Sequence, residues 1–525
     1  MTWLNIGEIV NVNAKKYPNK LALKDKRKEL TFKELNERTN KLTNGILKNG
    51  IKKGDKVAIL SNNCIEFMEL FIAAAKGGFI LVPLNFRLHP DDINFVIKNS
   101  DAKWFFVESR FYSTTEKIWK EAKELGFENI ERVLIADNPT EGWKFYEDLV
   151  EMGDNEYPSI KVDPEDTWII LYTSGTTGRP KGVIRSHRSF IAFFLINEVE
   201  FSFTPQDYGM ILMPLSHVNS IFHSFVFTYL GAPVFIHIEY NFNPEEVLKI
   251  ISQEKITFTS MIPTHYNLIL SLSEETIQKY DLNSINSLLT SSAPATKQMK
   301  LGVMKLFSKA RLFEAYGSTE AGLVTILRPE DQMNKLGSIG KECIGSDNIK
   351  LLDKEGNPVA IGEIGELYSR SPQLFDEYYK LPEKTKESFN GEHFSAGDMA
   401  TRDKDGFYYL VDRKANMIIS GGEHIYPSEV EKVILSHPSV KECAVVGLQD
   451  YKWGECVTGV CVLNENVDLD TFNEEMHQYC QDKLARFKIP KKFICISSKE
   501  IPRTSSGKII HRKLREKYDK QTSDL

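Results

Sequence analysis

Three observations predict a mixed α/β fold with a large N-terminal domain and a small C-terminal one. From about residue 20 to 290, short apolar runs alternate with helix-length segments, which is typical of βαβ units in mostly parallel sheets with helices on both faces. At 525 residues the chain exceeds what one hydrophobic core usually serves. Near residue 400 the sequence texture changes, which favours a separate small α/β domain.

The apolar runs mark the expected strands. They are short, rich in β-branched and aromatic residues, and separated by helical patterns, as buried parallel strands are. The runs lie at 57–60, 79–82, 168–172, 210–213, 234–236 and 287–290, and an apolar stretch of helix length at 64–76 separates the first two.

The domain boundary is expected just after a turn cluster at 403–406 and a strand at 407–411. We therefore predict an N-terminal domain over residues 1–411 and a mobile C-terminal domain over residues 412–525. The linker around 412–416 is short and has no Gly/Ser run, so we expect the two domains to be tightly coupled.

Composition excludes several classes of protein. The formal net charge of −6 argues against a nucleic-acid-coating protein. The seven cysteines are scattered, odd in number and free of CxxC pairs, which indicates a reducing compartment without structural zinc. No apolar run reaches 18 residues and the first residues do not begin a signal peptide, so we expect a cytoplasmic protein without a membrane span.

A hydroxyl- and glycine-rich loop follows the expected strand at 168–172. It runs from Thr173 to Lys181, and its glycines, hydroxyls and ammonium suit the oxygens of a polyphosphate. It is not a Walker loop, because Pro180 stands where that pattern requires glycine. Since a proline pushes Arg179 before it away from helical geometry, we do not expect the lysine in the first turn of a helix. Taken alone, the sequence of this loop is equally compatible with a phosphate-binding loop and with an ordinary surface loop.

Four further clusters carry residues with the right chemistry for a nucleotide. They lie at 291–294, 313–320, 395–398 and 502–509. The second offers an aromatic face for a purine and a carboxylate for Mg²⁺ on phosphate oxygens, and the third a carboxylate for ribose hydroxyls. The fourth is a second glycine–hydroxyl–lysine loop. Each alone has an ordinary alternative, but two such loops in two expected domains favour a nucleotide-dependent enzyme.

Together these residues resemble the acyl-adenylate-forming superfamily of acyl-CoA synthetases, luciferases and adenylation domains. The resemblance covers roughly residues 10–515, and the motifs stand in the family's order. The matching segments are 173–181, 316–320, 362–367, 397–398, Arg413 with 421–423, and 504–508.

The resemblance implies a two-step ligase that uses ATP, Mg²⁺ and coenzyme A. A small carboxylic acid is activated to an acyl-adenylate with release of pyrophosphate, and the acyl group then passes to the CoA thiol. Neutralising the charge that gathers as the carboxylate attacks the α-phosphorus is the main task. The implied catalytic residues are Lys508, which reaches the carboxylate and α-phosphate, Glu320, which holds Mg²⁺, and His217, a gate between the acyl and CoA sites.

Binding roles are implied in the same way. The signature loop with Lys181 cradles the β- and γ-phosphates, Tyr316 packs on adenine, Asp398 and Arg413 hold the ribose, and two glycines line the pantetheine path. The full implied set is Thr173, Ser174, Gly175, Thr176, Thr177, Gly178, Lys181, Ser292, Ala293, Tyr316, Gly317, Ser318, Thr319, Asp398, Arg413, Gly421 and Gly422.

The chain departs from the family at three places, and one is the adenine loop, which is usually rich in glycine or alanine and here reads Ser291-Ser292-Ala293. Asn219, Ser220 and His223 follow the gate histidine where the acyl pocket is built, and Ser220 replaces a frequent glycine. Burying such groups against an alkyl tail would leave them unpaired, at about 1–3 kcal/mol each. We therefore expect a medium-sized or ring-bearing acid with a polar substituent rather than a long saturated chain. At the hinge, Ala415 stands where relatives carry Asp or Lys.

Other functions share most of these motifs. A stand-alone adenylating enzyme that loads a carrier-protein thiol is the main alternative, and a luciferase-type oxygenase differs only in its substrate. A non-catalytic nucleotide sensor is disfavoured because Lys508, Glu320 and Asp398 are all present.

Overall fold

The computed structural model describes residues 5–123, 130–136, 138, 140–174, 179–238, 241–291, 293, 295–345, 349–420, 423–450, 453–464, 467, 469–504 and 507–523. By its internal contacts the chain divides into two compact units. Unit 1 comprises residues 1–349 and 369–394, and unit 2 comprises residues 350–368 and 395–525. Among the described residues, no helix combines the length and apolarity needed to span a bilayer.

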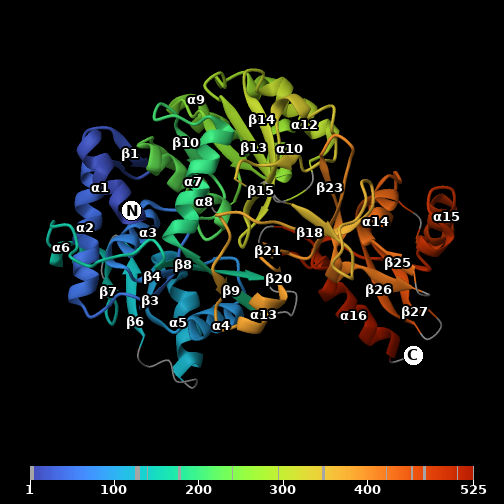
Figure 1. Cartoon of the computed structure of the whole chain (residues 1–525), viewed down its shortest axis with the longest axis horizontal. Helices are drawn as coiled ribbons and strands as arrows, with labels where there is room; N and C mark the ends of the chain where they lie inside the picture. Colours follow the sequence, from blue (N-terminus) through green and yellow to red (C-terminus); the bar gives the residue numbers. More distant parts are fainter. Residues whose placement is uncertain are drawn as a thin grey trace. The chain divides into compact units, whose positions relative to one another are not determined.

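Unit 1 contains an eight-stranded sheet that carries the signature loop (Figure 1). Its central strands are parallel, and β8 and β9 form an antiparallel pair near one edge. In spatial order the strands are β19 (Glu377–Tyr378), β9 (Pro180–Ser186), β8 (Thr167–Ser174), β4 (Ile80–Leu84), β3 (Lys56–Leu60), β5 (Ala102–Glu108), β6 (Glu131–Ile135) and β7 (Lys144–Phe145).

A nine-stranded sheet forms the second half of unit 1. Five of its pairings are parallel, from β1 through β11, β10, β12 and β13 to β14, and the pairings at both ends are antiparallel. The strands in spatial order are β16 (Lys341–Glu342), β15 (Gly322–Leu327), β14 (Arg311–Ser318), β13 (Ser287–Ser291), β12 (Phe258–Met261), β10 (Gly209–Ile211), β11 (Val234–Ile236), β1 (Leu21–Lys24) and β2 (Glu29–Thr31).

The mixed α/β fold class predicted from the sequence is confirmed. The expected strands are β3, β4, β8, β10, β11 and β13, shifted by at most two residues at an end. The apolar stretch at 64–76 is helix α3 (Ile65–Gly77), which is buried on every side, because neighbouring side chains pair with its charged residues Glu66, Glu69 and Lys76. The strand expected at 407–411 is β23 (Tyr408–Arg413).

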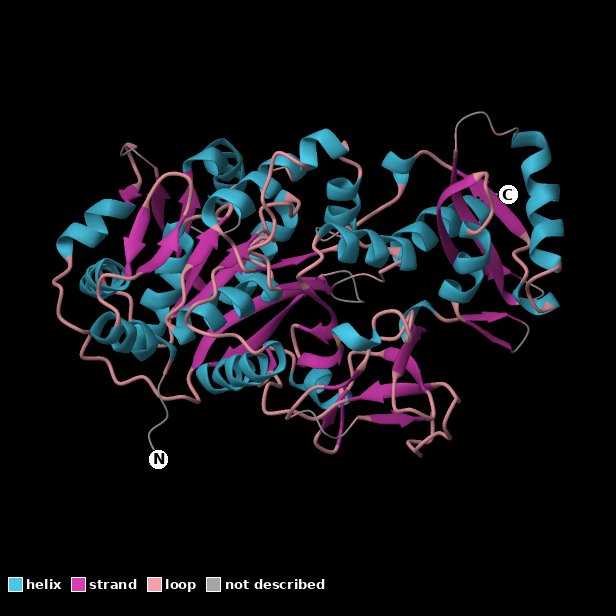
Figure 2. Ribbon diagram, turned by 90° about the horizontal axis from the view of Figure 1, so that it is seen from above, coloured by secondary structure: helices cyan, strands magenta, loops and turns pink. Residues whose placement is uncertain are grey.

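Helices cover both faces of the sheets of unit 1 (Figure 2). Helices α7 (His187–Phe201) and α8 (Val218–Leu230) occupy the centre, where Trp168 of β8 packs edge-on against Phe190 of α7 and Phe225 of α8 at 4.8 Å between ring centroids. This aromatic contact joins the signature-loop strand to the helix that carries the polar residues after the gate histidine. The other described helices of unit 1 are α1 (Ile6–Lys16), α2 (Phe32–Lys48), α4 (Pro90–Ser100), α5 (Tyr112–Lys123), α6 (Tyr146–Met152), α9 (Pro244–Glu254), α10 (Pro263–Leu270), α11 (Glu274–Ile277), α12 (Lys297–Leu306) and α13 (Pro382–Glu387). A short pair, β20 (Phe389–Asn390) and β21 (His393–Phe394), completes it.

Unit 2 holds two smaller sheets. An antiparallel four-stranded sheet contains β17 (Lys350–Leu352), β18 (Gly365–Tyr368), β22 (Asp398–Arg402) and β23. The other sheet contains β25 (Glu423–Ile425), β24 (Ile418–Ser420), β27 (Gly454–Leu463), β26 (Val440–Asp450) and β28 (Lys492–Cys495), with helices α14 (Pro427–Leu435), α15 (Leu469–Gln481) and α16 (His511–Ser523) around it. Because β22 and β23 pair within unit 2, the division by internal contacts falls before residue 411. The predicted domain boundary at 411/412 concerns which part of the chain moves, and it stays a prediction.

Candidate active site

The signature loop connects two antiparallel strands. Thr173 at the end of β8 pairs with Lys181 at the start of β9, so the lysine lies in a strand and not in a helix, as the proline before it predicts. The Thr173 hydroxyl is buried and has no hydrogen-bond partner among the described residues. An unpaired buried donor next to an ammonium suits an anionic ligand. The tip of the loop, Gly175, Thr176, Thr177 and Gly178, lies outside the described residues, as does the side chain of Ser174.

Three polar groups meet at the base of this loop. The Lys181 ammonium lies 2.9 Å from Oε1 of Glu320 and donates to the Tyr378 hydroxyl at 2.6 Å. That hydroxyl donates to the same Glu320 oxygen at 2.8 Å. Glu320 and Tyr378 are buried, so their charges and dipoles interact through protein rather than water. The structure thus brings together two predicted residues and adds Tyr378, which no local motif marked.

The adenine and magnesium motif is held by its backbone. Gly317 lies in β14, where a β-carbon would stand 2.1 Å from the carbonyl oxygen of Gly322, so the close approach of β14 and β15 requires glycine here. The Ser318 hydroxyl accepts from the N–H of Ala321, and the carbonyl of Glu320 accepts from the N–H of Phe375 at 2.7 Å. The motif is therefore a fixed turn whose carboxylate has a set direction.

Arg185 of β9 supports the same turn and was not foreseen from the sequence. Its guanidinium is fully buried and donates to the Thr319 carbonyl at 2.8 Å. Burial lowers the pKa of Arg185 to about 10, against the opposing effect of the Asp376 and Glu320 charges. The guanidinium also lies over the ring of Phe190, 5.0 Å from its centroid. A lone arginine in an apolar strand gives no sequence signal of this role.

The residues around the gate histidine surround the start of α8. His217 is the N-cap of α8, and its Nδ1 accepts from the N–H of Asn219. The Asn219 side-chain amide donates to Ser291 Oγ at 3.2 Å, which ties the first turn of α8 to the carboxyl end of β13. Ligands of parallel sheets gather at such ends. Of the adjacent predicted residues, Ala293 is exposed, and Ser292 lies outside the described part of the chain.

The other two predicted pocket residues differ in how they are paired. The Ser220 hydroxyl is buried and donates to the Met213 carbonyl at 2.7 Å, so the fold itself satisfies it. Ser220 therefore does not support the substrate class that was inferred from unpaired polar groups. His223 is also buried, with Nδ1 2.8 Å from the carbonyl oxygen of Asn219, while its Nε2 has no partner among the described residues.

In unit 2, two ion pairs surround the predicted ribose site. Arg413 Nε donates to Asp398 at 3.1 Å, and Lys414 Nζ lies 2.7 Å from Glu366, which also accepts from the Ser395 hydroxyl. Asp398 and Arg413 stand opposite each other on β22 and β23, so sheet register sets their distance.

Lys508 follows a turn closed by two hydrogen bonds between residues 504 and 508. The Lys508 N–H donates to the Thr504 hydroxyl, and the Thr504 N–H to the Lys508 carbonyl at 2.7 Å. Although residue 508 is exposed as a whole, burial around its ammonium is the largest cause that lowers the pKa of Lys508. The Arg413 charge lowers it further and Asp398 opposes this. The catalytic-lysine candidate and the predicted ribose residues thus lie near one another in unit 2.

The hinge candidate lies in a single 3₁₀ turn, Lys414–Asn416, directly after β23. Asp412 before it accepts hydrogen bonds from the backbone of Arg413 and Ser428 and from the Asn416 side chain. Ala415 is thus placed at an element boundary. Gly421 and Gly422, the predicted pantetheine glycines, lie outside the described residues.

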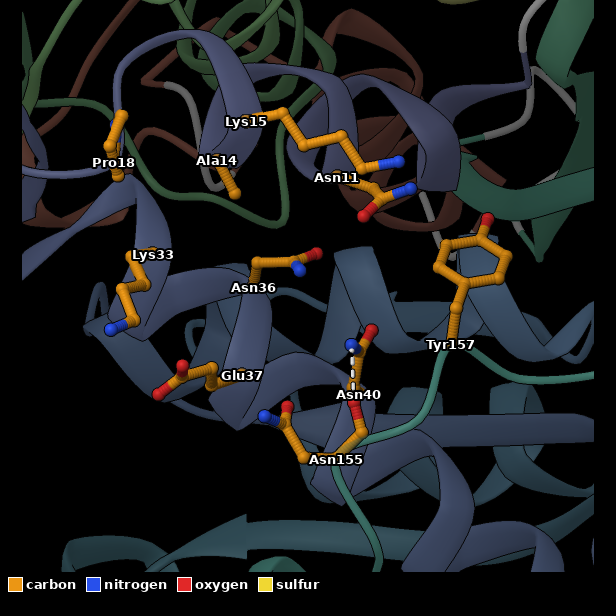
Figure 3. A pocket seen from close by; sticks show the side chains of 10 residues that line it. All are labelled: Asn11, Ala14, Lys15, Pro18, Lys33, Asn36, Glu37, Asn40, Asn155 and Tyr157. Carbon is orange, nitrogen blue, oxygen red and sulfur yellow. Dashed lines mark hydrogen bonds between the residues drawn. The ribbon is translucent and has the colours of Figure 1, made fainter.

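A separate polar groove of about 380 Å³ opens on unit 1 between α1 and α2 (Figure 3). The amide oxygens of Asn36 and Asn40 on its wall accept from the buried ammonium of Lys76. No predicted site residue lines it; its lining is Asn11, Ala14, Lys15, Pro18, Lys33, Asn36, Glu37, Asn40, Asn155 and Tyr157. The groove is therefore not part of the candidate active site.

Comparison with known proteins decides the family. The sequence model of the AMP-binding enzyme family matches residues 10–379, and that of the AMP-binding enzyme C-terminal domain matches residues 429–508. The chain belongs to the AMP-binding enzyme family. The resemblance to the acyl-adenylate-forming superfamily is thereby confirmed.

Curated relatives extend over nearly the whole chain. The long-chain-fatty-acid–CoA ligase FadD13 of Mycobacterium tuberculosis is 30% identical over 93% of this chain and 93% of its own length. The feruloyl-CoA synthase of an Amycolatopsis species is 31% identical over 96% of this chain and 97% of its own. The 2-succinylbenzoate–CoA ligase of Bacillus velezensis is 31% identical over 95% of both.

Solved structures agree. An anthranilate CoA ligase in complex with anthranoyl-AMP is 26% identical, covers 100% of this chain and 99% of its own, and superposes with a TM-score of 0.85. The o-succinylbenzoate CoA synthetase of Bacillus subtilis with its acyl-adenylate is 28% identical over 97% of both chains, with a TM-score of 0.82. The chain is an ATP-dependent, AMP-forming acyl-CoA ligase that makes an acyl-adenylate and transfers the acyl group to CoA.

Proposed function

We propose that the contacts among Lys181, Tyr378 and Glu320 form the triphosphate end of the ATP site. This is the observation that carries the assignment, because it joins the signature loop to the motif expected to hold the metal. Lys181 supplies positive charge to the β- and γ-phosphates, and the unpaired Thr173 hydroxyl supplies a donor beside it. Tyr378 fixes the directions of both charged groups.

The residues present fit a magnesium ion that is bound mainly by the nucleotide. The described residues contain no cluster of three metal-ligating side chains, which excludes a pre-formed protein cage there. Mg²⁺ in nucleotide sites typically takes one or two carboxylates together with phosphate oxygens and water. The contacts with Lys181 and Tyr378 both use Oε1 of Glu320, so its carboxylate would hold the cation through Oε2. Bound Mg²⁺ would supply charge neutralisation at the phosphates.

Asp398, Arg413 and Lys508 supply the remaining groups for the first reaction, the formation of the acyl-adenylate. Asp398 accepts the ribose hydroxyls, and Arg413 holds its carboxylate in place at 3.1 Å. Lys508 places an ammonium on the acid's carboxylate and the α-phosphate, where negative charges converge. Tyr316 packs on adenine, His217 separates the acyl and CoA sites, and Gly421 with Gly422 lines the path of the CoA arm.

For the acid we propose a medium-sized or ring-bearing substrate with a polar substituent. Asn219 and His223, one helical turn apart, place polar groups on one face of α8, and the Asn219 amide lies against the carboxyl end of β13. Of the relatives named above, two act by name on feruloyl and 2-succinylbenzoyl groups, which carry rings with polar substituents. We also place the enzyme in the cytoplasm, since all seven cysteines are free thiols.

The half-reactions test the role of Lys508. Lys508→Ala should lower acyl-adenylate formation by about 10²–10³, equivalent to roughly 3–4 kcal/mol, because a positioned charge is lost at the developing anion. Thioester formation from pre-made acyl-adenylate and CoA should survive. Lys513→Ala, an exposed lysine five residues on, is the matched control and should leave both rates unchanged. Equal loss in both half-reactions of Lys508→Ala would contradict the role.

The substrate class is tested by pyrophosphate release over a panel of short, medium, long, aromatic and hydroxylated acids. We expect the highest kcat/KM with a ring-bearing or medium-sized acid that carries a polar group. A best kcat/KM on palmitate would reject this class while leaving the ligase activity intact.

A further inference from the structure

One face of β9 places two cationic side chains against the same turn. Lys181 and Arg185 are four residues apart in this strand, so their side chains leave it on one side. The Lys181 ammonium lies 2.9 Å from Oε1 of Glu320. Nη1 of Arg185 donates to the carbonyl oxygen of Thr319 at 2.8 Å and lies 3.5 Å from that of Glu320. The strand thus contacts both the side chain of Glu320 and the backbone that carries it.

The guanidinium of Arg185 makes few of the hydrogen bonds that it could make. Its side chain is 0% exposed, yet Nε and Nη2 have no hydrogen-bond partner among the described residues. Instead, the ring centroids of Phe190 and Phe222 lie 5.0 and 5.5 Å from its central carbon. Buried donors without a partner destabilise a folded protein. Arg185 is therefore a poor choice of residue for stability alone.

An apolar side chain would suit this position better if packing were its only purpose. Val183, on the same face of β9, is fully buried and apolar, and the two phenylalanine rings beside Arg185 offer further apolar surface. Natural proteins break such local rules mainly at functional sites. The short hydrogen bond that Arg185 does make, to the carbonyl of Thr319, is therefore the contact that needs a functional explanation.

We propose that Arg185 is a positioning residue for the metal-binding carboxylate. By holding the Thr319 carbonyl it fixes the peptide before Glu320, and thereby the direction in which the Glu320 side chain leaves the backbone. The N–H of Phe375 holds the next carbonyl, that of Glu320, at 2.7 Å, so the turn is fixed on both sides of its carboxylate. This inference rests on the proposed function, in which Glu320 holds Mg²⁺ on the nucleotide.

Arg185→Met should separate the stability of the fold from the binding of the metal. Methionine keeps an unbranched apolar stem but leaves the Thr319 carbonyl without its donor, so Glu320 is held less firmly. Groups that orient a metal ligand typically change metal affinity by 10- to 100-fold, and we expect the contribution of Mg²⁺ to nucleotide binding to fall about 10-fold. Because two unpaired buried donors disappear as well, the Tm of the ligand-free enzyme should equal or exceed that of wild type.

The test measures binding rather than turnover, with the full-length enzyme and α,β-methylene-ATP, which cannot release pyrophosphate. Its Kd is determined by titration calorimetry in saturating Mg²⁺ and in EDTA, and the ratio of the two constants gives the contribution of the metal. General damage to the nucleotide site would change both constants alike and leave the ratio as it was. Arg188→Met, at an exposed arginine that pairs with Glu165, is the matched control and should keep the wild-type ratio.

Two conservative variants distinguish the hydrogen bond from the charge. Arg185→Gln keeps an N–H donor without a charge, and Arg185→Lys keeps both a donor and the charge. Each should retain a ratio nearer to wild type than Arg185→Met does. Retention of the ratio by Arg185→Lys alone would show that the charge is what matters, and would overturn the positioning role.

Glu320→Gln separates failure of this inference from failure of the proposed function. Its ratio should fall at least as far as that of Arg185→Met. If the ratio falls in Glu320→Gln while Arg185→Met keeps the wild-type ratio or does not fold, the positioning role is overturned and the metal assignment stands. A wild-type ratio in Glu320→Gln would instead count against Glu320 as the metal-binding carboxylate, and so against the proposed function.

Discussion

Tyr378 shows how one side chain can organise a charged site. Its hydroxyl accepts from the Lys181 ammonium and donates to the Glu320 carboxylate, and it is 2% exposed. Without a nucleotide, lysine and glutamate neutralise each other, which keeps two charges paired inside the protein. A bound triphosphate and its metal would take over both charges, so the tyrosine then serves to keep the two groups aligned.

Tyr378→Phe tests this at the residue scale. Removing the hydroxyl leaves the ring and the direct contact of 2.9 Å between lysine and glutamate, but it deletes two hydrogen bonds to charged groups. One such bond contributes roughly 1.5–3 kcal/mol, and because the remaining lysine–glutamate contact compensates part of the loss, we expect a net loss of about one bond, which lowers kcat/KM for ATP about 10- to 100-fold. ATP–pyrophosphate exchange measures this. Tyr379→Phe, whose hydroxyl bonds to exposed Asp101, is the adjacent control and should behave as wild type. An unchanged kcat/KM for ATP in Tyr378→Phe would remove the tyrosine from the site.

At the scale of elements, a histidine–glutamate pair ties α16, the helix after the turn of the catalytic-lysine candidate, to α14. The helix begins at His511, three residues after Lys508, and His511 Nε2 lies 2.7 Å from Glu431 on α14. The same glutamate oxygen accepts from the N–H of Val445 on β26. Burial lowers the pKa of His511, but the hydrogen bond and charge of Glu431 outweigh it, so the pKa is raised overall.

The His511–Glu431 pair should make the anchoring of α16 depend on pH. Because the folded pKa lies above the unfolded value of about 6.5, the stabilisation is fully present below pH 6.5 and is lost as pH rises through the folded pKa. Amide hydrogen exchange of α16, corrected for intrinsic rates, should therefore show stronger protection at pH 6 than at pH 9. His511→Gln and Glu431→Gln should both abolish that difference. The same pH dependence in all three proteins would show that the pair does not anchor the helix.

At the scale of the whole molecule, one chain must run two unlike reactions. In the proposed mechanism Lys508 serves the adenylation, whereas the thioester step needs room for the CoA thiol. The 3₁₀ turn at Lys414–Asn416 is the proposed pivot, because it stands between two elements with Asp412 holding the residues around it. A few backbone dihedrals at such a boundary are enough for a domain to turn.

Ala415→Pro tests the pivot. Proline fixes φ of residue 415 near −65°, a value that a 3₁₀ turn allows, excludes other φ values there, and also restricts Lys414 before it. We expect adenylation within about tenfold of wild type and a thioester rate lowered by about 10- to 100-fold, measured as separate half-reactions. Ala415→Gly, which frees the same dihedral, should keep both. Thioester formation at the wild-type rate in Ala415→Pro would move the pivot to another residue, with Lys414 the next candidate.

The amino-acid sequence by itself determined the alternation of strands and helices, and its motifs, through their resemblance to a family, supplied the candidate residues for the reaction. Lys181, Glu320 and Lys508 stand in short motifs whose spacing is set by one turn or one strand end, and such local patterns can be read in order along the chain. Pro180 likewise predicted that the signature lysine does not lie in the first turn of a helix, since the effect of a proline is confined to its neighbours.

Only the tertiary structure decided which distant groups meet. Tyr378 reaches Glu320 across 58 residues, and Arg185 reaches Thr319 across 134, because β19, β9 and β14 bring them together. The sequence equally could not tell which polar side chains find a hydrogen-bond partner. Ser220 and His223 are both polar, yet the fold gives the Ser220 hydroxyl a partner and leaves His223 Nε2 without one among the described residues. Pairing of this kind depends on sheet register and helix packing, which long-range contacts establish and local sequence does not encode.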